Sequence, residues 1–528
     1  MTALAPTHVH IDAERIDALL HASHPAHRPG IAVGVAHRGR PVLTRGYGLF
    51  DALHSDAPPK ALTPATPMRI GSVTKHFCAL AVMLLAEEGR LDPSDSVRRH
   101  LPELPPWAEP ITLTQLMSHT SGMRCHVDLL FFTSGAQGLA VPDALPYELL
   151  RGQGGVNFAA GSDFSYCNGG YLLLSMVVDR LAGVPLEQFL QTRVLQPLGM
   201  RNSFLQARDL AGPGRTATLH VVTPDGGYRQ GDFGIPIRGE GGLVSSVDDM
   251  LLWMAHLSLP RIGRAATWHA MRTPVALNNG ASTGYGLGLM SGEYRGQRVM
   301  HHSGGVVGGS SQMINLVDHA LDVVVISNTT EVDAVAVAAR IVDLCVTGLP
   351  PEPAAQVAAF TGAAYDSSNG RFVRLLNHEG RATIEVQGVK FPALLQNDGA
   401  WWARTNVATG LSLRPATEPG GLTCQDVSGL RVLQPLQPPK RGDLDGMQGL
   451  YRCDDAGFSA TLEVDGDATL RLQGCAGTIT YRLQPLADGL WKGEHGISTL
   501  PARPVIERCG AGLLFSTLRS RRLLLRRV

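Results

Sequence analysis

The chain has 528 residues, and its 46 basic side chains are balanced by 46 acidic ones. Zero net charge excludes a nucleic-acid-binding protein that acts through a basic field. A hydrophobic content of 44% excludes an acidic, disordered protein, and the length predicts about three domains.

Residues 12 to about 345 mix helical and strand patterns, which predicts an α/β domain. Hairpins rather than β-α-β crossovers connect its strands, so the sheet should be antiparallel and flanked by helices. In chain order we predict strands at 31–36 and 41–45, helices at 72–88, 171–181 and 248–257, strands at 312–316 and 321–327, and a helix at 333–346. Asp333 is placed to cap the last helix.

The composition changes after residue 347. Gly348 to Pro353 forms a stiff, proline-rich linker, and a second proline-rich joint lies at 434–440. Beyond the linker, short alternating segments separated by turns predict β structure at 382–387, 410–414, 460–464, 469–472 and 478–482. We therefore predict an α/β domain at 1–347 and two small all-β antiparallel barrels or sandwiches at 354–438 and 446–528.

The N-terminal residues contain no basic start followed by an apolar run, so no signal peptide is predicted. No apolar stretch reaches the roughly 18–20 residues of a membrane span. We therefore expect a cytoplasmic protein without membrane or nucleic-acid partners. The eight cysteines have no C-x-x-C pair, which predicts small buried side chains and neither a metal site nor a cofactor.

The positive charge is carried almost entirely by arginine, because only five of the basic residues are lysines: Lys60, Lys75, Lys390, Lys440 and Lys492. Lys75 alone falls in a predicted buried helix, where it follows Ser72 by one turn on the same face. An apolar helix and the positive end of its dipole both favour the neutral amine, which can act as a base for a serine nucleophile. The structural alternative is a capping serine and a lysine that extends to solvent.

Two further motifs carry polar groups suited to catalysis. Tyr166 and Asn168 precede Gly169-Gly170; a phenol can relay a proton and an amide can bind a substrate carbonyl, although this is also ordinary turn chemistry. His302 precedes Gly304 and Gly305, whose backbone N–H groups could form an oxyanion hole, the alternative being a glycine-rich loop with a solvated histidine.

A third pattern, from Gly280 to Gly284, matches the G-x-S-x-G nucleophile elbow around Ser282. That motif requires a strand before it and a helix after it. Asn278-Asn279 precedes it and a strand-like segment follows, so we interpret it as a loop.

Taken in this order, Ser72-x-x-Lys75, Tyr166-x-Asn168 and His302-x-Gly304 resemble the motifs of the penicillin-recognising serine hydrolases. This superfamily includes class C β-lactamases, DD-carboxypeptidases, esterases and D-aminopeptidases. Further segments resemble the family: 116–122, 195–200, 241–246 and 285–288. The resemblance covers residues 12–345 and implies a β-lactamase-like fold.

The resemblance is strongest to the bacterial D-aminopeptidases, through the residues around Tyr166 and the two following β domains. It implies a serine hydrolase that releases N-terminal D-amino acids from amides and short peptides, and a homodimer. His302 replaces a lysine that favours substrate carboxylates, which implies substrates without one. Ser72 would attack, Lys75 would take its proton and Tyr166 would protonate the leaving amine. Asn168, His302 and Gly304 would shape the substrate site.

The resemblance also implies that Ser72 and Gly305 contribute the oxyanion N–H groups and that a loop of the last domain reads the free amine of the substrate. The matching loop, 493–501, has no aspartate, so Glu494 is the candidate for this role. The alternatives are an esterase or β-lactamase-type hydrolase on the same fold, and a catalytically silent binding or sensor protein.

Overall fold

The computed structural model describes residues 7–54, 59–135, 141–209, 214–405, 410–440, 444–497 and 502–528. The chain forms two compact units. The first comprises Met1–Asp95, Tyr171–Val275 and Gly284–Glu352, and the second comprises Ser96–Gly170, Ala276–Thr283 and Pro353–Val528. The predicted boundaries at 1–347, 354–438 and 446–528 follow chain order and stay a prediction.

A six-stranded antiparallel sheet forms the centre of the first unit, with the strand order β3-β2-β12-β11-β10-β9. Its strands are β2 (Ile31–His37), β3 (Arg40–Tyr47), β9 (Met290–Tyr294), β10 (Gln297–Val306), β11 (Gly309–Leu316) and β12 (Leu321–Ser327). Each neighbouring pair is antiparallel, which confirms the predicted sheet type.

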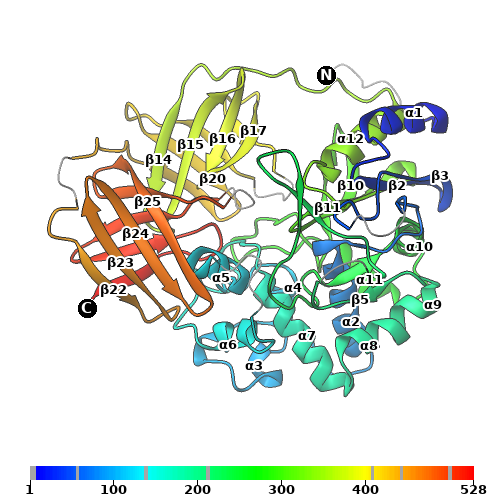
Figure 1. The fold of residues 1–528 in the computed structure, drawn as a ribbon, viewed down its shortest axis with the longest axis horizontal. Helices are drawn as coiled ribbons and strands as arrows, with labels where there is room; N and C mark the ends of the chain where they lie inside the picture. Colours follow the sequence, from blue (N-terminus) through cyan, green and yellow to red (C-terminus); the bar gives the residue numbers. More distant parts are fainter. Residues whose placement is uncertain are drawn as a thin grey trace. The chain divides into compact units, whose positions relative to one another are not determined.

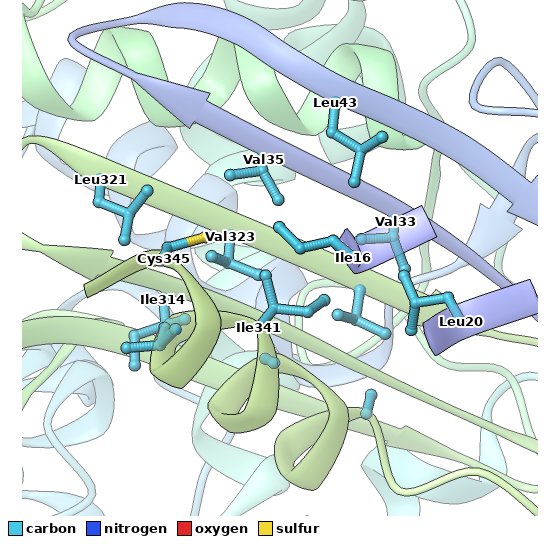
Figure 2. Close-up of a cluster of buried hydrophobic side chains, with 14 of the residues drawn as sticks. Ile16, Leu20, Val33, Val35, Leu43, Ile314, Leu321, Val323, Ile341 and Cys345 are labelled. Carbon is cyan, nitrogen blue, oxygen red and sulfur yellow. The ribbon is translucent and has the colours of Figure 1, made fainter. Parts of the chain in front are cut away.

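Helices cover both faces of this sheet because its central strands are apolar on both sides. On one face Val33, Val35 and Val323 pack against α1 (Ala13–Ser23) and α12 (Ala334–Cys345), as Figure 2 shows. Gly34 alternates with these residues and faces α10 (Val247–Ser258), where a Cβ atom would lie 2.6 Å from the side chain of Val247. Asp333 caps α12 as predicted, by accepting hydrogen bonds from the N–H groups of Val335 and Ala336.

The first unit also contains one buried helix, α2 (Thr74–Glu87), and several short elements. They are β4 (Met68–Arg69), the 3-10 turn η1 (Gly71–Val73), α8 (Leu186–Leu190), α9 (Gln196–Leu198), β5 (Phe204–Leu205), β6 (His220–Val222), β7 (Tyr228–Gln230), β8 (Leu243–Ser245), α11 (Ala265–Arg272) and the pair β1 (His8–Val9) and β13 (Val346–Thr347). Helix α7 (Asn168–Ala182) begins in the second unit and continues in the first. Among the described helices none alone could span a membrane, and only the bent pair Asn168–Ala182 and Leu186–Leu198 meets the length and composition criteria together.

The second unit combines short helices with two eight-stranded antiparallel β structures (Figure 1). Its helices are α3 (Val97–His100), α4 (Leu113–Met117), α5 (His126–Ser134) and α6 (Leu145–Arg151). Strands β14 to β21 form a nearly closed barrel: Gly362–Asp366, Arg371–His378, Arg381–Val386, Val389–Leu395, Trp401–Ala403, Ser412–Pro415, Leu422–Asp426 and Gly429–Leu433. Strands β22 to β29 form a closed barrel: Gly449–Cys453, Phe458–Asp465, Asp467–Gly474, Gly477–Ala487, Leu490–Glu494, Val505–Cys509, Gly512–Ser516 and Leu523–Arg527. The prediction of two all-β barrels is thereby confirmed.

The cysteines differ in part from the prediction. All eight are free thiols, and six of them are buried. Cys475 and Cys509 are exposed: Cys475 lies in the turn between β24 and β25, and Cys509 is the last residue of β27, at the turn into β28.

Candidate active site

Ser72 lies in a tight turn that leads from β4 into α2 in the first unit. The preceding Gly71 has a φ of +53°, a conformation that glycine adopts without strain. A Cβ atom on Gly71 would lie 2.9 Å from the backbone N of Gly305, so no other residue fits here. The turn therefore holds Ser72, which is half-buried, directly beside the backbone of β10.

Lys75 follows Ser72 by one helical turn and is fully buried. Its Nζ lies 3.2 Å from Ser72 Oγ and 2.6 Å from the carbonyl oxygen of Glu240, to which it donates a hydrogen bond. The Tyr171 ring lies 5.3 Å from the same nitrogen. The lysine thus does not extend to solvent, and its amine is held within proton-transfer distance of the serine hydroxyl.

The edge of β10 is open beside Ser72. Strand β9 pairs with β10 only as far as His301, whereas β11 pairs along the other edge as far as Val306. A Cβ atom on Gly304 would lie 1.9 Å from the carbonyl oxygen of Ile70, so this glycine is required by the close approach of the two segments. Gly305 is exposed, and its N–H group belongs to the β10 backbone that approaches Gly71. This arrangement suits an oxyanion hole.

His302 is buried and neutral rather than solvated. Burial, together with His76 and Lys75, holds the pKa of His302 well below its ordinary value. Its Nδ1 lies 2.6 Å from the carbonyl oxygen of Ser303 and its Nε2 lies 2.9 Å from the hydroxyl of Tyr285. A neutral ring must donate from Nδ1 to the carbonyl, so Nε2 accepts from the tyrosine. This position therefore carries no positive charge.

Tyr166 and Asn168 belong to the second unit, where they flank Cys167 at the start of α7. Both are half-buried. His119 packs its ring 4.1 Å from the Tyr166 ring and accepts a hydrogen bond at Nδ1 from the N–H group of Cys167. His119 itself has a φ of +61°, a strained conformation for a residue with a side chain. The tyrosine is thus positioned by a buried histidine from the predicted family segment 116–122.

A loop of the closed barrel supplies a second neighbour of Tyr166. Arg519, between β28 and β29, places its guanidinium 5.1 Å from the centre of the Tyr166 ring. Burial opposes the charge of Arg519, but attraction to Cys125, Asp128 and Tyr166 raises its pKa. The loop is anchored by a hydrogen bond from Thr517 to Asp128. A phenolate on Tyr166 would therefore be stabilised by a nearby cation.

Glu494 lies on β26 of the closed barrel and is paired with two cations. Its Oε1 lies 2.7 Å from Lys492 Nζ and its Oε2 lies 2.7 Å from Arg503 Nε. Burial opposes ionisation, but the hydrogen bonds from Lys492 and Arg503 hold the pKa of Glu494 below its ordinary value. The carboxylate is therefore ionised and engaged within its own barrel. Residues 498–501 of the predicted loop 493–501 lie outside the described residues.

The structure thus brings Ser72, Lys75, His302, Gly304 and Gly305 together in the first unit, whereas Tyr166, Asn168 and Glu494 belong to the second. The rejected elbow around Ser282 is a loop, as interpreted from the sequence. Sequence reasoning missed the roles of four residues that contact these motifs: His119, Glu240, Tyr285 and Arg519. Three of them lie in or directly beside the family segments 116–122, 241–246 and 285–288, which was a usable signal, but nothing marked Arg519.

The fold and this site define a hydrolase of the superfamily that contains the serine β-lactamases and penicillin-binding proteins. A profile of the beta-lactamase family matches residues 16–346, and the chain therefore belongs to this family. The chain is similar to the D-aminopeptidase of Brucella canis, with 26% identity over 468 residues, 87% of this chain and 86% of the relative. It is 25% identical to the D-aminopeptidase of Gluconobacter oxydans over 476 residues, 88% of this chain and 87% of the relative.

Two solved structures share the fold. The octameric penicillin-binding protein homologue from Pyrococcus abyssi has 20% identity and a TM-score of 0.54, with 98% of this chain and 100% of that chain covered. The D-amino acid amidase from Ochrobactrum anthropi SV3, in complex with D-phenylalanine, has 21% identity and a TM-score of 0.53. That comparison covers 63% of this chain and 99% of the amidase.

Proposed function

We propose that this protein is a serine-type D-aminopeptidase, which hydrolyses amides and short peptides that carry an N-terminal D-residue. The observation that carries the proposal is the contact between Ser72 Oγ and the Nζ of the buried Lys75, which are 3.2 Å apart. It is supported by the similarity of this chain to D-aminopeptidases, which extends over most of the length of those relatives.

Each step is assigned to a residue of this chain. Ser72 Oγ attacks the carbonyl carbon while its proton passes to Lys75 Nζ, and the N–H groups of Ser72 and Gly305 stabilise the oxyanion. The C–N bond then breaks, the leaving amine takes a proton from Tyr166, and the tyrosine recovers a proton from the Lys75 ammonium. Water hydrolyses the acyl-enzyme and regenerates the serine. Asn168, His302 and Gly304 shape the substrate site in this scheme.

The neutral state of His302 supports the choice of substrate. A lysine at this position would attract a carboxylate, whereas a buried neutral imidazole does not. Amides and peptides whose carboxylate lies away from the reacting bond suit such a site better than substrates that need a cation there.

A stereochemical assay tests the function. We expect kcat/KM for D-alanine p-nitroanilide to exceed that for the L-enantiomer by about 100-fold or more, because a mirror-image substrate cannot place both its amine and its carbonyl correctly. An acetyl ester and a chromogenic cephalosporin serve as comparisons. Preference for the L-compound or the ester would exclude the peptidase, and hydrolysis of the cephalosporin alone would indicate a β-lactamase.

Glu494 is tested separately as the group that binds the substrate amine. In this hypothesis Glu494→Gln lowers kcat/KM for D-alanine p-nitroanilide about tenfold, since a hydrogen bond to a charged group contributes roughly 1.5–3 kcal/mol. Hydrolysis of the acetyl ester, which has no amine, should not change. Glu507→Gln removes another carboxylate of the same barrel and is the control. If kcat/KM for D-alanine p-nitroanilide is the same in Glu494→Gln and in the unmodified protein, Glu494 serves only to form ion pairs with Lys492 and Arg503.

The cytoplasmic location and the homodimer stay predictions. Light scattering of the purified full-length chain measures the assembly directly. A mass of twice 56.3 kDa would agree with the dimer, and a larger or a monomeric particle would contradict it.

A further inference from the structure

A cleft of about 530 Å³ lies beside α11 in the first unit. Its lining residues all fall between Pro260 and Pro274, in α11 and in the loops before and after this helix. The part of the candidate active site in this unit is formed by residues 71–75 and 302–305, so the cleft is a separate feature. Pockets that bind small molecules typically have volumes of roughly 300–1,000 Å³. The cleft therefore has the size of a small-molecule site.

The larger part of the cleft surface is apolar. Its apolar walls are formed by Pro260, Ala265, Trp268 and Pro274. The indole N–H group of Trp268 donates to the carbonyl oxygen of Ile262 at 2.7 Å, so its donor is already used within the protein. Carbon surface is therefore what these walls offer to the body of a ligand.

Arg272, the last residue of α11, is a cation in the lining of the cleft. Its Nη2 donates to the carbonyl oxygen of Leu257, and its guanidinium lies 5.5 Å from the centre of the Trp268 ring. Its Nε is buried without a hydrogen-bond partner, and no described carboxylate forms an ion pair with it. A carbonyl, a ring and the C-terminal end of a helix all attract a cation, but none of them is an anion. The charge of Arg272 therefore has no counter-ion among the described residues.

The groups around Arg272 add positive rather than negative charge. His256, on α10, is buried, and burial together with Arg261 and Arg272 lowers its pKa to about 4. The histidine is therefore neutral at neutral pH. The acid beside the start of α11 is Glu87, which accepts a hydrogen bond from the N–H group of Arg264 at 2.6 Å and lies 3.9 Å from the Nε of that arginine. The described residues near the cleft thus leave an excess of positive charge.

We propose that this cleft binds a small organic carboxylate with an apolar body. The carboxylate accepts hydrogen bonds from the guanidinium of Arg272, whose planar fork of N–H groups matches two carboxylate oxygens. The apolar part of the ligand packs on the wall formed by Trp268 and the prolines. Binding supplies the counter-ion that a partly buried cation normally has. This site goes beyond the proposed function, because it involves neither Ser72 nor Lys75.

The test is calorimetric titration of the full-length chain with phenylacetate, which combines an aromatic ring with a carboxylate. 2-Phenylethanol has the same ring without the charge, and inorganic phosphate has the charge without the ring. We expect phenylacetate to bind at least about tenfold more tightly than either compound, because both the charged hydrogen bonds and the burial of the ring contribute.

Two variants and a control locate the binding. Arg272→Gln keeps a donor for the carbonyl of Leu257 but removes the charge, whereas Ala265→Phe fills the cleft and leaves Arg272 in place. We expect each variant to weaken phenylacetate binding about tenfold or more. Arg264→Gln is the matched control, since it removes an exposed arginine that precedes α11 and lies beside Glu87 rather than in the lining of the cleft. This control should bind phenylacetate as the unmodified chain does.

Unchanged binding in a folded Arg272→Gln or Ala265→Phe variant would overturn the proposal, as would an equal loss in Arg264→Gln. Thermal unfolding identifies which variants are folded, and one folded variant of the two suffices. Equal affinity for phosphate or for 2-phenylethanol would contradict the ligand class. Absence of phenylacetate binding up to about 10 mM would exclude the site.

Binding at the candidate active site is separated by repeating the titration after a fluorophosphonate probe has reacted with Ser72. Binding by the cleft should persist in this adduct, and binding that disappears with it would also overturn the proposal. None of these measurements uses hydrolysis. A protein that binds phenylacetate as expected but does not hydrolyse D-alanine amides would therefore contradict the proposed function and leave the carboxylate site supported.

Discussion

Replacing Ser72 with alanine should abolish hydrolysis of every substrate, with kcat/KM reduced by about 10⁴-fold or more. Its hydroxyl lies just before the start of α2, with the Lys75 amine 3.2 Å away. The fluorophosphonate adduct seen by mass spectrometry should disappear in the same variant. The melting temperature should change little, because the hydroxyl is small and only half-buried.

The control for this variant is Ser23→Ala, which removes an exposed hydroxyl bonded only to the carbonyl of Leu19 within α1. It should keep full activity and labelling. Hydrolysis that survives in Ser72→Ala would mean that another nucleophile acts. A protein that forms no adduct even with Ser72 intact would favour the silent binding protein instead.

Replacing Lys75 with methionine should lower kcat/KM by about 10³-fold, the usual scale for loss of a general base. Lys75→Arg should be equally inactive, because a guanidinium does not give up its proton and cannot serve as a base. Lys75→Met should not lower the melting temperature, since it replaces a fully buried amine with an apolar chain of similar length. Loss of activity without loss of stability separates a catalytic role from a structural one.

Lys60→Met provides the comparison, because the Lys60 ammonium lies over the Phe50 ring, 4.0 Å from its centre, on an exposed segment of the same unit. We expect unchanged kcat/KM in this variant. Activity above a tenth of the original value in Lys75→Met would show that the base lies elsewhere.

Local patterns predicted the elements of the sheet well. The hairpin at 31–45, the strand at 321–327 and the helix capped by Asp333 all depend on residues close in sequence, and the structure contains each of them. The short helices between residues 97 and 151 were not predicted. They have four to nine residues each, too few for a helical period to stand out from the turns around them.

The candidate site also contains contacts between residues close in sequence, which could be predicted, and contacts between distant residues, which could not. Ser72 and Lys75 are one helical turn apart, so their contact could be predicted from spacing alone. Arg519 lies more than 350 residues after Tyr166, and only the folded barrel brings its loop to the tyrosine. The neutral charge state of His302 could not be predicted from the sequence either, because it depends on burial and on the hydroxyl of Tyr285. The solvated alternative for this histidine is wrong for that reason.

Lys75 is anchored by the main chain of residue 240, and no side-chain substitution can remove a backbone carbonyl. The location of the amine therefore depends on the path that the main chain takes through this turn, and not on the side chain at position 240. Substitutions at position 240 that keep the path of the turn should therefore leave the lysine in place.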